Sequence, residues 1–509
     1  MLRKRRGIEV PRISSFVPLH VLMMVLVGLN PCVPLAKGQT KTSPTSVCHE
    51  CISIRVGLPR VERGPAADIA DNTFSELQLP DGHFRGFDAH GDTRAIDGSE
   101  PWDMNGPART VLTPGKPGSY DSCGQWIQHV ELTGNTVLAF VHDETACRYQ
   151  AGQTHKSMSM AVSKDYGLTW KDLGQVITGT DAPTANKNTG EGDCTFVNGH
   201  DGYYYAYCGR PRDRAAIALR APTSNPGPGQ WMKFHQGKWS QPGLGGDATN
   251  LNLGLGKGRG LNTSAAYWTT TSETILPGFQ GGSNKGVYFS SDHTTFSGLQ
   301  EPLMVLDPGI WKRPDPSEVV GYAVILDAKT GSNQLSNSWM LVYAYWPPYE
   351  GGDKKYLVFR DVTVSLSDHP VTPQVGVLLA RWYNSALHDR WSTTAAAPPV
   401  NGSAYKLETT SGYLLTVANA GGKPTVELED CVSQRPGHPD HLLAEKGFCT
   451  AREYQRLRTA GWLYTSPQEE TVPLYRCYNS REQSHFASNK SDCEKLGEMQ
   501  RLLGYALGK

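Results

Sequence analysis

The octapeptide Ser163–Trp170 constrains the fold of this chain more than any other stretch of its sequence. It reads Ser-Lys-Asp-Tyr-Gly-Leu-Thr-Trp. The carboxylate of Asp165 can accept hydrogen bonds from backbone amides of its own turn, and Gly167 can adopt a backbone conformation that other residues resist. Thr169 and Trp170 then begin an outgoing strand, with an aromatic ring available for packing. The pattern predicts a β-hairpin whose turn is held by side-chain hydrogen bonds.

The octapeptide resembles the Asp box, or BNR repeat, of sialidases and other secreted β-propellers, in which the box joins the two outer strands of a blade. The resemblance implies β-propeller architecture and structural roles for Ser163, Asp165, Gly167, Thr169 and Trp170. It implies no catalytic role, because the box lies away from the active site in those proteins. Function therefore has to be argued from other residues.

The size and composition of the chain fit a β protein. The 509 residues are too many for one compact domain and predict two or three. The chain contains 54 Gly, 34 Pro and 12 Trp, which is typical of a turn-rich β protein rather than a helical one. We therefore expect an all-β protein.

Residues 1–38 have the features of a secretory signal peptide. The basic run Arg3–Arg6 precedes an apolar segment from Phe16 to Leu29, and small residues near Ala36 and Gly38 mark the expected cleavage region. A signal-anchor that stays in the membrane is the alternative, although proline and polar residues interrupt the segment. No other segment is apolar enough to span a bilayer, so we expect a secreted protein with no membrane association after cleavage.

The charge of the mature chain argues against nucleic-acid binding. The full chain has 49 Lys+Arg and 49 Asp+Glu, and residues 1–38 hold six of the basic residues and one of the acidic residues. Cleavage would leave 43 basic and 48 acidic residues, a net charge of −5. A nucleic-acid partner would require a basic surface.

The cysteines predict a disulfide framework. Of 11 cysteines, Cys32 falls in the signal segment, which leaves an even number in a secreted chain. Spacing predicts the pairs Cys48–Cys51, Cys123–Cys147, Cys194–Cys208, Cys431–Cys449 and Cys477–Cys493. The first pair could also be a metal or redox motif, but no second Cys/His pair follows at finger spacing. The chain also carries the glycosylation sequons Asn262, Asn401 and Asn489.

Two consecutive hairpins indicate a repeat architecture. Residues 125–142 read as two strands about a turn at Thr133–Asn135, and Cys194–Cys208 reads as a hairpin about Asn198–Gly202. Each predicted disulfide lies symmetrically across its own turn. Further strand pairs follow at intervals of roughly 50 to 65 residues. With Phe74–Leu112 contributing to the closing blade, we expect five blades, with six as the alternative.

The sequence beyond Pro373 predicts a second β domain. Three units of about 40 residues begin at Arg381–Ser385, Glu429–Ser433 and Arg476–Ser480. They resemble small repeat domains appended to secreted bacterial enzymes, which implies a pseudo-threefold, β-trefoil-like fold. Each unit carries one of the histidines His388, His441 and His485, which we expect at equivalent positions with a structural rather than a metal-binding role.

These observations give the expected domain organisation. It comprises a signal peptide at 1–38, an N-terminal segment at 39–59, a β-propeller at 60–372 and a threefold β-repeat domain at 376–509, with carbohydrate binding as a possible role for the last.

Carboxylates are expected to gather at one rim of the propeller. In each blade the first strand starts at the central funnel, and the antiparallel second strand returns to the same rim. In the first hairpin these positions hold Asp121 and the run His142-Asp143-Glu144, and in the second they hold Glu191, Asp193 and Arg210. A register slip would turn alternate side chains to the other face. We expect the five carboxylates in one pocket, with His142 and Arg210 as substrate contacts.

The stretch Gly190–Val197, followed by Asp201–Tyr205, resembles the second-blade strand of five-bladed glycosidases that act on furanosides and xylosides. The resemblance implies that Asp193 tunes the pKa of the acid and that Asp121 or Asp143 is the base. The acid of that family, a Glu in the third blade, has no clear match, so Glu191 or Glu144 would have to serve. Glycoside hydrolysis requires such a pair of carboxyl groups.

The favoured function is hydrolysis of an extracellular or cell-wall polysaccharide by a secreted, monomeric glycosidase without cofactor or metal. The alternative is a non-catalytic carbohydrate-binding or adhesion protein, and a third possibility is a protein-interaction propeller. A sialidase would need an arginine triad, and the candidates Arg210, Arg313 and Arg360 lie in separate units. We expect Trp126, Trp170, Trp231 and Trp239 to pack between blades rather than to bind sugar.

Overall fold

The computed structural model describes residues 47–509, except for 68, 252, 254–263, 281–282, 400–403, 436 and 450–452. The expected signal peptide, Cys32 and the sequons Asn262 and Asn401 lie outside the described residues. Among the residues described, no helix has the length and apolarity that a bilayer crossing requires.

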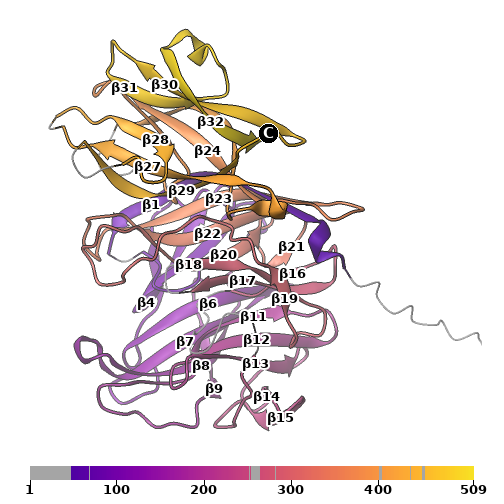
Figure 1. The fold of residues 1–509 in the computed structure, drawn as a ribbon. Helices are drawn as coiled ribbons and strands as arrows, with labels where there is room; N and C mark the ends of the chain where they lie inside the picture. The colour runs from indigo at the N-terminus through magenta and orange to yellow at the C-terminus, as the bar shows by residue number, and fades with distance from the viewer. Residues whose placement is uncertain are drawn as a thin grey trace, which may run out of the picture. The chain divides into compact units, whose positions relative to one another are not determined.

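The described part of the chain is all-β (Figure 1). Its helical segments are single turns of 3-10 helix, η1 (His49–Cys51), η2 (Tyr149–Ala151), η3 (Ala420–Gly422) and η4 (Cys493–Lys495).

Five sheets follow one another along the chain. The first contains β2 (Ser75–Gln78), β3 (Phe84–His90), β4 (Asp92–Gly98) and β5 (Arg109–Leu112). The second contains β6 (Gly124–Thr133), β7 (Thr136–Arg148), β8 (Gln153–Ser163), β9 (Lys171–Thr178) and β10 (Asn188–Gly190). The third contains β11 (Gly192–Asn198), β12 (Tyr203–Arg210), β13 (Ala215–Pro222), β14 (Met232–His235) and β15 (Lys238–Pro242).

The last two sheets include strands from distant parts of the sequence. The fourth contains β16 (Ala266–Trp268), β17 (Glu273–Gln280), β18 (Ser283–Ser290), β19 (Ser297–Leu299) and β21 (Gln334–Leu335). The fifth contains β20 (Val319–Asp327), β22 (Ser338–Trp346), β23 (Lys355–Leu366) and β1 (Ile52–Ala66).

Hydrophobic cores join each sheet to the next and close the ring. Each of five clusters of buried side chains draws on two neighbouring sheets, including the fifth and the first. Representative pairs are Phe87 with Val141, Phe140 with Phe196, Tyr205 with Tyr267, Trp268 with Trp339, and Phe359 with Phe74. Within the described residues the sheets therefore form a five-bladed propeller, which was the favoured count.

The expected closing of the ring is corrected. Residues 74–112 form a blade of their own, and the strand that completes the fifth blade is β1, which pairs with β23 from Ile52 opposite Leu366 to Ala66 opposite Lys355. The first propeller strand thus begins before residue 60. Ile52, Ile54 and Val56 are fully buried, with partly buried residues between them. This alternation is the period-2 pattern of a half-buried strand.

The octapeptide Ser163–Trp170 joins β8 and β9, the outer strands of the second blade. The Asp165 carboxylate accepts hydrogen bonds from the Leu168 amide at 3.2 Å, the Thr169 amide at 2.9 Å and the Thr169 hydroxyl at 2.6 Å. Trp170 packs edge-on against Phe87 of the first blade. The turn therefore organises one outer blade edge and also contributes to packing between blades.

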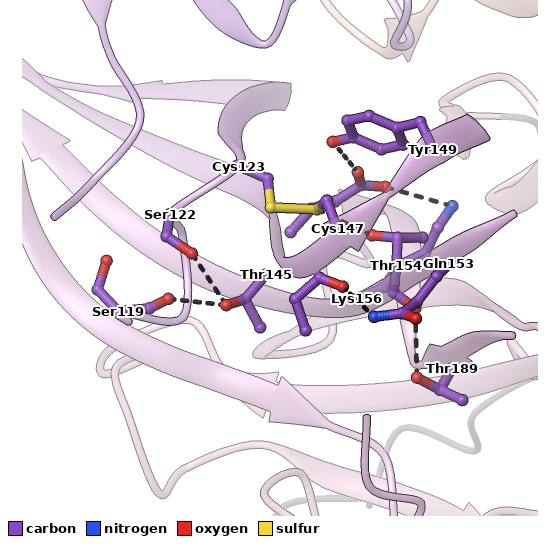
Figure 2. Close-up of a disulfide and its surroundings, with 12 residues drawn as sticks. Ser119, Ser122, Cys123, Thr145, Cys147, Tyr149, Gln153, Thr154, Lys156 and Thr189 are labelled. Atoms are coloured by element: carbon purple, nitrogen blue, oxygen red, sulfur yellow. Dashed lines mark hydrogen bonds and ion pairs between the residues drawn. A yellow bond between two sulfur atoms is a disulfide. The ribbon is translucent and has the colours of Figure 1, made fainter. Parts of the chain in front are cut away.

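Five disulfides are present among the described residues, and the pairs are those expected from spacing. The Cα atoms are 6.3 Å apart in Cys123–Cys147 and 4.0 Å apart in Cys194–Cys208. Each of these two bridges ties the first and second strands of one blade. Figure 2 shows Cys123–Cys147 with Tyr149 and Lys156 close by, so this bridge lies beside the candidate site described below.

Residues 375–507 form three repeats of three strands. The first contains β24 (Val375–Asn384), β25 (Asp389–Thr393) and β26 (Lys406–Leu415). The second contains β27 (Thr425–Ser433), β28 (His441–Glu445) and β29 (Tyr454–Tyr464). The third contains β30 (Thr471–Asn479), β31 (Ser484–Ser488) and β32 (Glu498–Leu507). The strands β26, β29 and β32 pair with one another near their ends, which brings the three repeats together.

The expected equivalence of the three histidines is wrong for His388. The equivalent residues are Arg390, His441 and His485, whose backbone amides each donate to a side-chain oxygen of another repeat. His388 lies two residues before Arg390, in the turn between β24 and β25. The rings of His441 and His485 contact carboxylates of the preceding repeat at 2.6 and 2.8 Å. These contacts join repeats, as a structural role requires.

Candidate active site

The candidate site lies where strand starts and strand returns of several blades converge. Two of its residues, Asp193 in β11 and Tyr322 in β20, have left-handed backbone conformations with φ of 50° and 53°. Both stand at register shifts, between Gly192 and Thr195 and between Gly321 and Val324. Bulges of this kind redirect side chains next to functional sites. Residues other than glycine rarely adopt such φ values, so the surrounding structure holds them there.

The first part of the site is a carboxylate pair bridged by a lysine. Lys156 Nζ, from β8, lies 2.5 Å from Asp193 Oδ2 and 3.9 Å from Glu144 Oε1. Burial alone would raise the pKa of both carboxyls, but the Lys156 charge and the His142 contacts outweigh it, and both pKa values are lowered. The same carboxylates outweigh the burial of Lys156 and raise its pKa. The three groups are therefore all charged near neutral pH.

His142 links the two carboxylates. Its Nδ1 accepts a hydrogen bond from the Asp193 backbone amide at 3.1 Å, so the ring proton is on Nε2. Nε2 is 3.2 Å from Glu144 Oε1 and donates to it. The Tyr149 hydroxyl donates to the other oxygen, Glu144 Oε2, at 2.7 Å. Glu144 is thus held on both oxygens.

Asp71, which precedes the first strand of the first blade, supplies a third carboxylate. Its Oδ1 accepts a hydrogen bond from the Tyr322 hydroxyl at 3.1 Å and lies 3.8 Å from Lys355 Nζ. Its Oδ2 lies 3.4 Å from His90 Nδ1. Burial opposes ionisation, but these contacts dominate and lower the pKa of Asp71 to about 2. The side chain is 37% exposed, so this carboxylate is both charged and reachable.

The charge of Asp71 acts on the groups of the bridged pair. The negative charge of Asp71 acts against the fall in the pKa of Asp193 and supports the raised pKa of Lys156. Burial and the charges of Asp71, Asp193 and Glu144 raise the pKa of Tyr322 far above its ordinary value. Tyr322 therefore stays protonated and can only donate from its hydroxyl to an anion.

Aromatic rings border the site on the side of the fifth blade. Trp311 packs edge-on against Trp346 and Tyr322, with ring centroids 5.1 and 6.1 Å away. Trp346 lies under Lys355, whose Nζ is 5.5 Å from the ring centroid. Trp311 remains 43% exposed. A partly exposed tryptophan beside Tyr322 offers a surface on which a sugar ring can stack.

Three of the predicted site residues meet in this cluster, namely His142, Glu144 and Asp193. Four do not. Asp143 is buried on the opposite face of β7, where Asp121 and Asp172 are its nearest charges and burial raises its pKa well above the usual range. Asp121 accepts a hydrogen bond from the Ser119 hydroxyl. For Asp143 the cause is strand alternation, since neighbours in a strand point to opposite faces, whereas Asp121 lies in the turn before β6.

Glu191 and Arg210 also lie outside this cluster. Glu191 forms an ion pair with Lys233 at 2.6 Å, and neither side chain is exposed. Arg210 pairs with Asp213 at 2.8 Å and donates to the Ala248 carbonyl oxygen. Both residues are buried and engaged in contacts of the third blade.

Asp71, Lys156, Tyr322 and Trp311 were missed. Asp71 obeys the rule that located Asp193, since it stands just before the first strand of a blade. Its blade, however, is expected from the sequence to be the closing one. Lys156 lies in a third strand, and Tyr322 depends on a bulge, so neither had a sequence signal.

The tryptophans and arginines singled out from the sequence have structural contacts. Trp126 packs against His142, Trp170 against Phe87, Trp231 against Phe140 and Trp239 against Phe234. Arg313 donates to the Ser317 and Pro347 carbonyl oxygens, and Arg360 donates to that of Gly57. Arg210 is paired with Asp213. These three arginines therefore do not converge on one point, as a sialidase-type site for a substrate carboxylate would require.

No protein-family model matches the chain, and no curated protein sequence matches it. Solved structures show a distant likeness. Zg3597, a family 117 glycoside hydrolase from the marine bacterium Zobellia galactanivorans, is 9% identical with a TM-score of 0.43, over 63% of this chain and 92% of that one.

Two further solved structures are of the same distant kind. The catalytic domain of a GH62 α-L-arabinofuranosidase from Coprinopsis cinerea is 10% identical with a TM-score of 0.38, over 62% of this chain and 98% of that one. An exo-1,5-α-L-arabinanase from a bovine ruminal metagenomic library is 10% identical with a TM-score of 0.37, over 60% of this chain and 99% of that one. With TM-scores below 0.5, the fold and the site rest on the sheets, cores and contacts of this chain.

Proposed function

We propose that this protein is a secreted glycoside hydrolase that acts on an extracellular or cell-wall polysaccharide. One observation carries the proposal: carboxylates of the first three blades, Asp71, Glu144 and Asp193, gather around Lys156 and Tyr322 beside an exposed tryptophan. Paired carboxyl groups on either side of a scissile bond are the usual machinery of glycoside hydrolysis.

Asp71 is the proposed general base. With a pKa of about 2 it is ionised throughout the ordinary pH range, and its exposure allows it to contact a water molecule. Tyr322 and Lys355 orient it from one side. Asp193 takes the tuning role, because it shares Lys156 and His142 with Glu144.

Glu144 is the proposed general acid. Its pKa is lowered in the free protein, so it can donate a proton only after a bound sugar weakens its contact with Lys156 or His142. Trp311 is the proposed stacking surface for a sugar unit next to the scissile bond.

The remaining expectations complete the proposal. Five disulfides favour an extracellular location. Residues 1–38 are proposed as the signal peptide and the residues between it and β1 as an N-terminal segment, and the propeller is proposed to extend from β1 to residue 372. Residues 376–509 are proposed as a β-trefoil-like domain that holds the substrate, and the protein is proposed to act as a monomer without cofactor, metal or nucleic acid. Asn489 remains a proposed glycosylation site.

The second candidate is a lectin-like propeller. It is favoured by the same electrostatics, since cations or hydrogen-bond donors hold the pKa of Asp71, Glu144 and Asp193 below their usual values. Ionised carboxylates beside an open tryptophan are well suited to binding sugar hydroxyls without bond cleavage.

One experiment separates the two candidates. The mature protein and its Asp71→Asn variant are screened for hydrolysis of aryl glycosides and polysaccharides, and for binding to the same polysaccharides. Hydrolysis that depends on Asp71 supports the enzyme. Binding without hydrolysis by either protein supports the lectin, and neither activity would reject both.

A further inference from the structure

The segment that carries Trp311 is held by the C-terminal repeats. Residues 305–318, here called the Trp311 segment, lead from the fourth blade into β20 of the fifth. We propose that Arg456 and Arg458 of β29 are positioning residues that fix Trp311 at the substrate site. The C-terminal domain is then a structural part of that site and more than a module that holds polysaccharide. This inference rests on the proposed function, because it takes Trp311 to contact the glycan.

The beginning of the segment is held by three contacts from β29. Arg456 Nη1 forms an ion pair with Asp307 at 2.8 Å, and the Thr459 backbone amide donates to the same carboxylate at 3.2 Å. Arg458 Nη2 donates to the carbonyl oxygen of Val305. These contacts lower the pKa of Asp307, although burial acts in the opposite direction.

The end of the segment is held by the same arginine. Arg458 Nε lies 2.7 Å from Glu318 Oε1, and both side chains are buried, at 7% and 5% exposure. The other oxygen, Glu318 Oε2, accepts the Ala396 backbone amide at 3.4 Å. One side chain of the C-terminal domain therefore contacts both ends of a propeller segment.

Between these ends the segment presents Trp311 to the site. Arg313 donates to the Ser317 and Pro347 carbonyl oxygens, which folds the segment onto the fifth blade. Trp311 packs over Gly321, where an added Cβ would lie 2.5 Å from the Trp311 ring. It also contacts Tyr322, whose hydroxyl donates to Asp71. A continuous series of contacts thus runs from β29 to the proposed base.

Stability alone explains this arrangement poorly. The sheet of the fifth blade already continues into the C-terminal repeats, because β1 pairs in parallel with β24, with Ile54 opposite Val375 and Val56 opposite Val377. Those residues also share one hydrophobic core. A buried ion pair such as Arg458–Glu318 adds little net stability compared with apolar contacts, whereas it fixes geometry.

The test uses exposed members of the network, because removing Arg458 would leave Glu318 buried and unpaired. The variants are Arg456→Gln and Asp307→Asn, which both break the Arg456–Asp307 pair. Arg456→Gln also breaks the Arg456–Glu429 pair within the C-terminal domain, 2.8 Å long, so Asp307→Asn is the decisive variant. The matched control is Arg501→Gln, which removes the exposed Arg501–Glu445 pair of the same domain, also 2.8 Å long. Each is made in the full mature chain, with and without Trp311→Ala.

Steady-state kinetics on the best polysaccharide substrate give the first readout. Arg456→Gln and Asp307→Asn are expected to raise KM about fivefold and to change kcat less than about twofold, whereas Arg501→Gln changes neither. In the Trp311→Ala background the Arg456 and Asp307 variants should add less than about a twofold further change, because their effect passes through Trp311. Equal effects in both backgrounds, or none on KM, would overturn the proposal.

Hydrogen exchange of the backbone amides gives a readout that needs no substrate. Residues 305–318 should exchange faster in Arg456→Gln and Asp307→Asn but not in Arg501→Gln. Faster exchange in a protein that hydrolyses no glycan would reject the proposed function but would still support the positioning of the Trp311 segment by Arg456 and Arg458. Unchanged exchange and an unchanged KM in an active enzyme would reject the positioning role of Arg456 and Arg458 and leave the proposed function standing.

Discussion

Glu191 and Asp193 stand two residues apart at the start of the third blade, and each pairs with a lysine, yet the two pairs differ in their surroundings. The Glu191–Lys233 pair, 2.6 Å long, is completely buried. The Asp193–Lys156 pair, 2.5 Å long, lies in the funnel, where Asp193 is 26% exposed. Two nearly identical contacts therefore occupy a sealed interior and an open site.

Their electrostatics differ in direction. In the buried pair desolvation dominates, so the pKa of Glu191 is raised and that of Lys233 is lowered. In the funnel the opposite charges outweigh burial, so the pKa of Asp193 is lowered and that of Lys156 is raised. In the buried pair the pKa shifts favour the neutral forms of Glu191 and Lys233, whereas in the funnel pair they favour the charged forms of Asp193 and Lys156. The comparison suggests that exposure and the sign of the pKa shifts distinguish a structural pair from a functional one.

The largest expected effect concerns the funnel. Asp71→Asn should reduce turnover about 10²- to 10⁴-fold, because the amide cannot accept a proton from water. Thermal stability at neutral pH should fall only by the modest amount that the ionised, partly exposed Asp71 carboxylate contributes, too little to account for the loss of turnover. Turnover within a factor of about two of the unmodified enzyme would remove Asp71 from the mechanism.

The buried pair should respond in stability instead. Lys233→Met leaves Glu191 buried and uncompensated and should lower the free energy of unfolding by about 3–5 kcal/mol in denaturant titration. Lys156→Met is the matched variant in the funnel, where water can solvate the remaining carboxylates, so the loss should be smaller. Equal losses would mean that the two pairs do not differ as proposed.

The outer edge of the second blade provides a reference remote from both pairs. Asp165→Ala removes the acceptor of four hydrogen bonds and should lower the free energy of unfolding by about 1–3 kcal/mol. Turnover per folded molecule should be unchanged. A loss of turnover without a loss of stability would place the octapeptide in the active site.

The smallest effect is a pH dependence of stability. The folded-state pKa of Asp71 is about 2, below its ordinary value of 3.8. A depressed pKa stabilises the folded state fully above the ordinary value, and this stabilisation disappears as pH falls from 3.8 toward 2. The difference in unfolding free energy between the unmodified protein and Asp71→Asn should therefore shrink over that range. A constant difference would contradict the ionised state assigned to Asp71.

The sequence predicted features that depend on local pattern. Hairpin turns located the blades, and cysteine spacing gave the disulfide pairs. The position of Asp193 at the start of a strand correctly predicts its place in the cluster. For Asp143 and Glu191 the prediction fails, because the sequence does not show which alternate side chains of a strand face the funnel. Bulges set this orientation at Asp193 and Tyr322. Contacts between different strands, such as those of Lys156 with Glu144 and Asp193, have no local pattern in the sequence that would predict them.

The most direct test compares Asp193→Asn with Glu191→Gln on the best substrate, with rates expressed per folded molecule. The account predicts that Asp193→Asn loses about 100-fold or more in turnover with its folded fraction intact, while Glu191→Gln loses stability and keeps its turnover. Full turnover in Asp193→Asn, or a selective loss of turnover in Glu191→Gln, would contradict the assignment of the funnel as the active site.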